Sequence, residues 1–105
     1  MRILFMGTPD FAVPSLQALL DAGHEVCGVF TQPDKPKGRG YTLTPPPVKV
    51  YAEEKGLPVY QPRTLRDEEF ADLLRQIDPE VIVVVAFGKI LPANVLSYPK
   101  YGCVN

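Results

Sequence analysis

The 105-residue sequence predicts an α/β fold, in the form of a Rossmann-like, doubly wound and mostly parallel sheet. The strongest evidence is the run from Val81 to Ala86, which has six apolar residues, five of them β-branched. This run is too short for a buried helix and lacks polar alternation, so it predicts a central strand covered on both faces. Other apolar runs alternate with helical patterns along the chain, and parallel strands need such crossover connections.

The first half of the chain predicts a strand, a helix and a second strand. Arg2–Met6 is a short apolar run that ends in a Gly-Thr-Pro turn. Apolar residues then recur at helical spacing from Val13 to Leu20, and Gly23 supplies the stop. The second strand is expected at Glu25–Thr31.

The second half predicts a helix, a brief strand, a second helix, the central strand, a single short turn and the start of a fifth strand. Prolines around the brief strand remove hydrogen-bond donors, which places it at a sheet edge. The carboxylates of Asp67, Glu68 and Glu69 fall in the first turn of the helix expected at Arg66–Asp78, where the helix dipole favours them. Besides the central strand, the expected ranges are Val48–Lys55, Pro58–Tyr60, Arg66–Asp78, Ala93–Leu96 and Tyr101–Asn105.

Composition narrows the possible functions. The chain has 11 basic and 12 acidic residues and a net charge of −1, so only a local cluster of cations could favour a nucleic-acid partner. No apolar run approaches the ~20 residues that span a bilayer, and the start lacks a signal-peptide pattern, which predicts a cytoplasmic protein. Cys27 and Cys103 are expected to be buried, reduced thiols rather than a disulfide, and no metal site is predicted.

The turn after the first strand argues against a nicotinamide or flavin cofactor. The dinucleotide-binding signature is G-x-G-x-x-G, whereas this chain has Gly7-Thr-Pro-Asp-Phe-Ala12. Pro9 stands where the second glycine is needed, which blocks close approach of the backbone to a pyrophosphate and removes an amide donor.

The segment from Asp34 to Lys49 is predicted to be a long irregular loop, and such loops are usually functional or disordered. From its second residue onward it carries four cations and no acid, at Lys35, Lys37, Arg39 and Lys49. On charge alone, a solvated surface loop is the simpler interpretation. The only histidine, His24, lies at the amino end of a strand and is expected on the surface.

Three blocks of sequence stand out together. They are the opening M-R-I-L-F-M-G-T-P-D-F-A-V-P, the loop Q-P-D-K-P-K-G-R-G with its later P-V-K, and the strand and loop V-V-V-A-F-G-K-I-L-P. Together they resemble the methionyl-tRNA formyltransferase family, and the match runs the whole length of the chain. Any one block alone would be weak evidence.

The resemblance implies a formyltransferase fold and, in translation initiation, transfer of a formyl group from 10-formyltetrahydrofolate to the amino group of initiator methionyl-tRNA. It implies a cytoplasmic, monomeric parent protein without a metal. Residues 1–105 would be the amino-terminal part of the catalytic domain, ending after the start of the fifth strand and inactive alone. Asn105 would match the Asn of the family's catalytic Asn-x-His pair, with the His two positions further on; otherwise an Asn at a strand end is commonly a turn former.

The resemblance also implies binding residues. The loop after the central strand would bind folate through Phe87, Gly88, Lys89, Ile90, Leu91 and Pro92. Ile90 and Leu91 would both line an apolar slot for the pterin ring and belong to the core, whereas Lys89 need not contact the ring and could simply point to solvent. The turn after the first strand would belong to the active site, through Gly7, Thr8, Pro9 and Phe11. The basic loop would contact the tRNA acceptor end through Lys35, Lys37, Arg39 and Lys49, so binding would depend strongly on salt.

Other functions stay open at this point. A sugar-nucleotide formyltransferase or a formyltetrahydrofolate hydrolase-type domain shares the fold, but the basic loop favours a tRNA over a small substrate. A non-catalytic binding module is also possible, because the expected catalytic His is not among the 105 residues. Binding of folate or tRNA without turnover would support the module.

Overall fold

The computed structural model describes residues 1–38, 40 and 42–105. Over these residues the main sheet has five strands: β1 (Arg2–Gly7), β2 (Glu25–Phe30), β5 (Val59–Tyr60), β6 (Val81–Val85) and β7 (Cys103–Val104). They lie in the order β5-β2-β1-β6-β7, and every neighbouring pair is parallel. The predicted parallel sheet is confirmed, and the brief proline-flanked strand β5 is an edge strand, as predicted.

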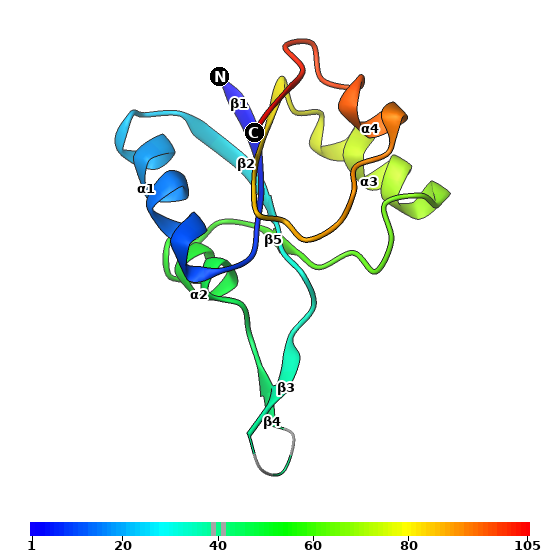
Figure 1. The fold of residues 1–105 in the computed structure, drawn as a ribbon. Helices are drawn as coiled ribbons and strands as arrows, with labels where there is room; N and C mark the ends of the chain where they lie inside the picture. The colour runs from blue at the N-terminus through cyan, green and yellow to red at the C-terminus, as the bar shows by residue number, and fades with distance from the viewer. Residues whose placement is uncertain (39, 41) are drawn as a thin grey trace.

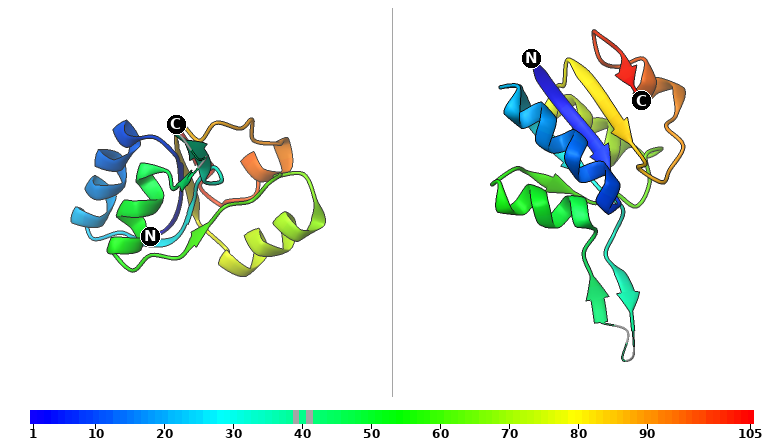
Figure 2. Two further views of the ribbon diagram at one scale, coloured as in Figure 1. Left: turned by 90° about the horizontal axis from the view of Figure 1, so that it is seen from below. Right: turned by 60° about the vertical axis from the view of Figure 1, so that its left-hand side comes forward.

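Helices cover both faces of this sheet. α1 (Val13–Asp21) and α2 (Pro47–Glu54) lie on one face, and α3 (Glu68–Ile77) and α4 (Ala93–Leu96) lie on the other (Figures 1 and 2). The short 3-10 turn η1 (Asp10–Ala12) leads into α1. The sheet is therefore doubly wound, as predicted. No helix in the described part of the chain is long and apolar enough to cross a membrane.

The side chains of β1 alternate between the two faces of the sheet, and each face has its own part of the hydrophobic core. Leu4 and Met6 join Phe30 in a cluster packed against α3 and α4, whereas Phe5 joins Leu16 of α1 in the opposite cluster. These five side chains are fully buried. Successive side chains of a strand point to opposite faces, so one central strand anchors both halves of the core. The carboxyl end of β1 is thereby held rigidly in the middle of the sheet.

The apolar run that predicted the central strand forms β6, between β1 and β7. Val81 and Ile82 are buried, but the last three valines of the strand are only half-buried, so the prediction of full cover on both faces is wrong there. The reason is that β7 pairs only as far as Val83. Ala86 lies beyond the strand with a φ of 51°, a left-handed conformation that costs an L-residue ~1–2 kcal/mol. It turns the chain out of the sheet.

The start of α3 differs slightly from the prediction. Asp67 is the N-cap rather than a first-turn residue, and its carboxylate accepts a hydrogen bond of 2.8 Å from the backbone N–H of Phe70. The helix ends at Asp78, whose φ of 50° is left-handed and whose N–H donates to the carbonyl of Leu74. Glu68 and Glu69 occupy the first turn, as predicted.

The segment between β2 and α2 is not an irregular loop, which corrects the prediction. β3 (Lys35–Lys37) and β4 (Thr42–Thr44) pair antiparallel, with Lys35 opposite Thr44. This hairpin projects away from the sheet and helices (Figures 1 and 2), and the longest dimension of the molecule is 45 Å. The prolines and glycines of the segment suggested irregular backbone. A two-stranded ribbon of three residues per strand accommodates them because each strand has a free edge.

Candidate functional site at the carboxyl edge of the sheet

The carboxyl ends of β1, β2 and β6 place three polar or irregular segments side by side. Thr8 follows β1, Thr31 and Gln32 follow β2, and Ala86 and Phe87 follow β6. Ligands of open α/β sheets bind at this edge, because loops that leave parallel strands in the same direction can surround a common space. Most of the predicted site residues therefore lie within one region.

A small hydrogen-bond network joins these strand ends. The hydroxyl of Thr8 donates to the carbonyl oxygen of Phe87 at 2.8 Å, and the side-chain amide of Gln32 donates to the same oxygen at 3.2 Å. The backbone N–H of Gln32 donates to the Thr8 hydroxyl oxygen at 3.3 Å. The sequence analysis assigned Thr8 and Phe87 to the site but missed Gln32. Its position one residue beyond the end of a parallel strand was the available signal.

The first two residues of the loop after β6 are packed tightly against their neighbours. Phe87 is buried, and Gly88 has a φ of 97°. A Cβ at Gly88 would lie 2.9 Å from the amide nitrogen of Gln32, so a side chain there would displace the amide that binds Phe87. The backbone of this loop is therefore fixed by a residue that follows β2, the strand on the far side of β1.

Two residues of the predicted folate loop lie differently from the expectation. Ile90 is 85% exposed, so the prediction that it belongs to the core is wrong, whereas Leu91 does pack against the core on the α3 side. Lys89 does not simply point to solvent. Its ammonium donates to the carbonyl of Pro62 at 3.0 Å and to that of Arg63, which ties the loop to the segment after β5. Pro92, the last residue of the loop, is the N-cap of α4.

The turn after β1 keeps the shape expected of Gly-Thr-Pro. Gly7 is enclosed, because a Cβ there would lie 2.8 Å from both the carbonyl oxygen of Val85 and the ring of Phe5. Pro9 is the N-cap of η1. Phe11 is 66% exposed beside this turn, which leaves a large aromatic surface uncovered at the site.

Of the four predicted cations, Lys49 is paired with an acid. Lys35 is exposed on β3, while Arg39 and the side chain of Lys37 lie outside the described part of the chain. Lys49 is instead paired at the hairpin base, with its ammonium 3.1 Å from the carboxylate of Asp34 and 3.1 Å from the amide oxygen of Gln61. The expectation of an unpaired +4 cluster is thus corrected, because the acid directly before the basic run neutralises its last member.

The base of the hairpin is a tight polar cluster. The amide of Gln61 donates to Asp34 at 2.7 Å and to the backbone carbonyl of Gln32 at 3.1 Å. Hydrogen bonds from Gln61 and then Lys49 hold the pKa of Asp34 below its ordinary range, because both favour the ionised carboxylate. Asp34 therefore stays charged at neutral pH and keeps the hairpin base attached to the sheet.

Asn105 and His24 lie at opposite ends of the strands. Asn105 is exposed and follows β7, at the carboxyl edge where a catalytic group would be needed. His24 is exposed just before β2, at the amino edge, and its surface position is confirmed.

The two cysteines are free and only half-buried, so the expectation of full burial is wrong. Partial burial raises the pKa of both the Cys27 and the Cys103 thiols. Within the described residues, no group of three or more His, Cys, Asp or Glu side chains could hold a metal ion.

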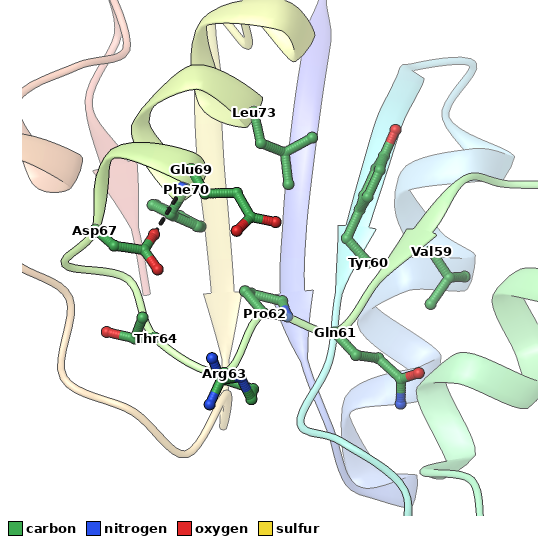
Figure 3. Close-up of a pocket in the computed structure, with 10 residues that line it drawn as sticks. All are labelled: Val59, Tyr60, Gln61, Pro62, Arg63, Thr64, Asp67, Glu69, Phe70 and Leu73. Atoms are coloured by element: carbon green, nitrogen blue, oxygen red, sulfur yellow. Dashed lines mark hydrogen bonds between the residues drawn. The ribbon is translucent and has the colours of Figure 1, made fainter.

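A cavity of about 460 Å³ lies beside β5 and was not predicted. In Figure 3, Tyr60 of β5 and Leu73 of α3 face one another across it, with Arg63 at its lower end. The connection from β5 to α3 supplies half of its lining residues, so the only sequence signal was a polar stretch directly after a strand. Its full lining is Val59, Tyr60, Gln61, Pro62, Arg63, Thr64, Asp67, Glu69, Phe70 and Leu73.

Comparison with known proteins identifies the family of the chain. The sequence model of the family described as formyl transferase matches residues 1–105, the whole chain. The chain belongs to the formyl transferase family. This assignment agrees with the parallel sheet and with the position of the candidate site at its carboxyl edge.

Named members of the formyl transferase family are similar over the whole chain. The chain is 62% identical to a methionyl-tRNA formyltransferase of Moorella thermoacetica, 58% to one of Clostridioides difficile and 57% to one of Pelotomaculum thermopropionicum. The matches to the Moorella and Pelotomaculum proteins cover 100% of this chain and 34% of the relative. The chain thus spans about a third of the length of these relatives.

Solved structures of formyl transferases share the fold. The phosphoribosylglycinamide formyltransferase from Anaplasma phagocytophilum superposes with a TM-score of 0.68 at 15% identity, over 98% of this chain and 47% of that one. The enzyme of the same name from Bacillus halodurans gives a TM-score of 0.66 at 14% identity, over 98% of this chain and 54% of that one. At this level of identity the likeness is one of fold.

Proposed function

We propose that the protein is a methionyl-tRNA formyltransferase. It transfers the formyl group of 10-formyltetrahydrofolate to the amino group of initiator methionyl-tRNA, in the cytoplasm and as a monomer. The observation that carries this proposal is the identity of 57 to 62% with proteins of that name over the full chain. Residues 1–105 correspond to the amino-terminal part of the catalytic domain.

The folate donor is assigned to the loop from Phe87 to Pro92. The exposed side chain of Ile90 offers apolar surface for the pterin ring, and a large aliphatic group in water gains from being covered. Backbone N–H and C=O groups around Gly88 supply the polar edge that fixes the orientation of the ring. The bonds from Thr8 and Gln32 to Phe87 support this assignment, since a preorganised loop loses less entropy on binding.

The chemistry requires a donor to a developing oxyanion. The amine nitrogen of the methionyl group attacks the formyl carbon, and the carbonyl oxygen becomes an oxyanion. The bond from carbon to N10 of the folate then breaks, the amine loses a proton, and N10 takes one up to leave as tetrahydrofolate. The side-chain amide of Asn105 can donate to the oxyanion, and one such donor is worth ~3 kcal/mol.

The tRNA acceptor end is assigned to the hairpin of β3 and β4 and to the turn at the site. Lys35, Lys37 and Arg39 provide the cations for phosphate contacts, whereas Lys49 keeps the hairpin attached through Asp34. The exposed ring of Phe11 lies on the turn that follows β1 and offers a stacking surface for a base or for the methionyl side chain.

The decisive experiment is an assay of the full-length protein with 10-formyltetrahydrofolate and one acceptor at a time. Formyl transfer to methionyl-tRNA is expected, with no transfer to a sugar-nucleotide amine and little release of free formate. Replacement of the oxyanion donor by Asn105→Asp should lower kcat ~100- to 1,000-fold, whereas Asn94→Asp on the exposed face of α4 should leave it unchanged.

Each of the other outcomes would indicate a different function for this protein. Transfer to a sugar amine, or rapid formate release without an acceptor, would place the protein in another branch of the family. Binding of folate and tRNA without turnover would indicate a binding module.

A further inference from the structure

The carbonyl of Phe87 is fixed by groups from two other strands. The Thr8 hydroxyl reaches it from β1 at 2.8 Å, and the Gln32 amide reaches it from β2 at 3.2 Å. The Gln32 amide lies against Gly88, where an added Cβ would come within 2.9 Å of its nitrogen. The conformation of the loop after β6 therefore depends on where Gln32 is held.

Gln61 determines the position of both Gln32 and the hairpin. Its amide nitrogen donates to the backbone carbonyl of Gln32 at 3.1 Å and to the carboxylate of Asp34 at 2.7 Å. Its amide oxygen accepts from the ammonium of Lys49 at 3.1 Å. All three partners bind one half-buried side-chain amide, so Gln61 cannot turn without breaking several of these bonds.

Both ends of the hairpin are tied to this network. The outgoing strand β3 begins directly after Asp34, which Gln61 and Lys49 hold. The returning strand β4 leads into α2, where the N–H of Val48 donates to the backbone carbonyl of Thr8 at 3.3 Å. A continuous set of hydrogen bonds thus runs from the hairpin base to Phe87.

We propose that Gln32 and Gln61 are positioning residues that couple the hairpin to the loop from Phe87 to Pro92. The hydrogen bonds of Gln61 and Gln32 join part-buried groups, so they can open locally. A polyanionic acceptor bound to the hairpin holds the bonds of Gln61 closed, and through Gln32 this favours the bonded position of the Phe87 carbonyl. Binding of the acceptor therefore raises the affinity for folate, and folate raises the affinity for the acceptor by the same factor, as linkage requires. This inference rests on the proposed function.

The test is the affinity of the full-length protein for tetrahydrofolate, with and without saturating methionyl-tRNA. Tetrahydrofolate carries no formyl group, so no reaction occurs and calorimetry reports binding alone. The unmodified protein should bind it ~5-fold or more tightly in the presence of the tRNA. Gln61→Leu should remove this tightening, and Gln32→Met should do the same from the other end of the network.

Controls separate coupling from damage to the fold. Gln17→Leu makes the same kind of change on the exposed face of α1, outside the network, and should keep the tightening. Thermal melting checks that each variant folds; because the two network variants alter different elements, either one that folds provides the test.

Two results would overturn the coupling. One is equal affinity with and without tRNA in the unmodified protein, and the other is full tightening in a folded network variant. Both can occur in a protein that transfers formyl groups normally, so they leave the proposed function intact. Failure of the unmodified protein to bind either ligand would instead reject both proposals.

Discussion

Gly7, the last residue of β1, is tightly enclosed by its surroundings. A Cβ there would approach the carbonyl oxygen of Val85 and the ring of Phe5 to 2.8 Å, and neither can move freely in the core. Gly7→Ala should therefore lower the free energy of unfolding by ~2 to 3 kcal/mol, in the range of overpacked cores. Urea unfolding of the full-length protein would measure the change.

A second glycine provides the comparison. Gly23 has open space around it but a φ of 84°, so Gly23→Ala meets only a backbone cost of ~1 kcal/mol. Asn tolerates that conformation, and Gly23→Asn should recover part of the loss, whereas Gly7→Asn should be worse than Gly7→Ala. Equal stability of Gly7→Ala and the unmodified protein would contradict the close approach.

Single residues of the site were only partly predictable. The sequence placed Thr8 and Phe87 correctly at strand ends, because strand ends follow from apolar runs. It could not reveal that Lys49 binds Asp34 or that Lys89 reaches the carbonyl of Pro62, since these contacts depend on how a hairpin and a loop fold back. Ile90 was misjudged because an apolar residue beside a core strand is usually buried, and here it is exposed.

Among the elements, α3 has the best-defined start. The carboxylate of Asp67 accepts the hydrogen bond of the Phe70 N–H, which otherwise has no partner within the first turn. Asp67→Ala should therefore cost ~1 kcal/mol of stability, measured by thermal or urea unfolding. The matched control is Asp72→Ala in the same helix, where the carboxylate only pairs with Arg75 on an exposed face.

The control variant Asp72→Ala should lower the free energy of unfolding by ~0.5 kcal/mol or less, as for other exposed ion pairs. Similar losses for the two variants would mean that the cap adds nothing beyond surface charge.

Strands and helices of the main sheet were predictable, and the hairpin was not. Apolar runs of five or six residues and helical spacing gave β1, β2, β6, α1 and α3 within a few residues. The strands Lys35–Lys37 and Thr42–Thr44 bury little and carry polar side chains, so no apolar pattern marks them. Their antiparallel pairing is formed between backbones, which a pattern of apolar residues does not record.

Across the whole molecule, acid should loosen the attachment of the hairpin to the sheet. The pKa of Asp34 is held below its ordinary range by Gln61 and Lys49, whereas in the unfolded chain it returns to ~3.9. As the pH falls through that value, the unfolded state takes up a proton that the folded state resists, so stability decreases. The contribution is fully present above the unfolded pKa and is lost on acidification through the folded pKa.

Urea unfolding at a series of pH values between 7 and 3 would measure this effect. The Asp34→Asn variant should lose less stability over that range than the unmodified protein, because it has no carboxylate to protonate at the hairpin base. Parallel losses in the two proteins would show that Asp34 does not contribute.

The strand β5 closes one side of the sheet with only two residues, between Pro58 and Pro62. Neither proline has a backbone N–H, so a passing strand from another molecule finds few groups with which to pair. The edge therefore resists extension by neighbouring molecules. Such protection lowers the tendency of this margin of the sheet to start aggregation at high protein concentration.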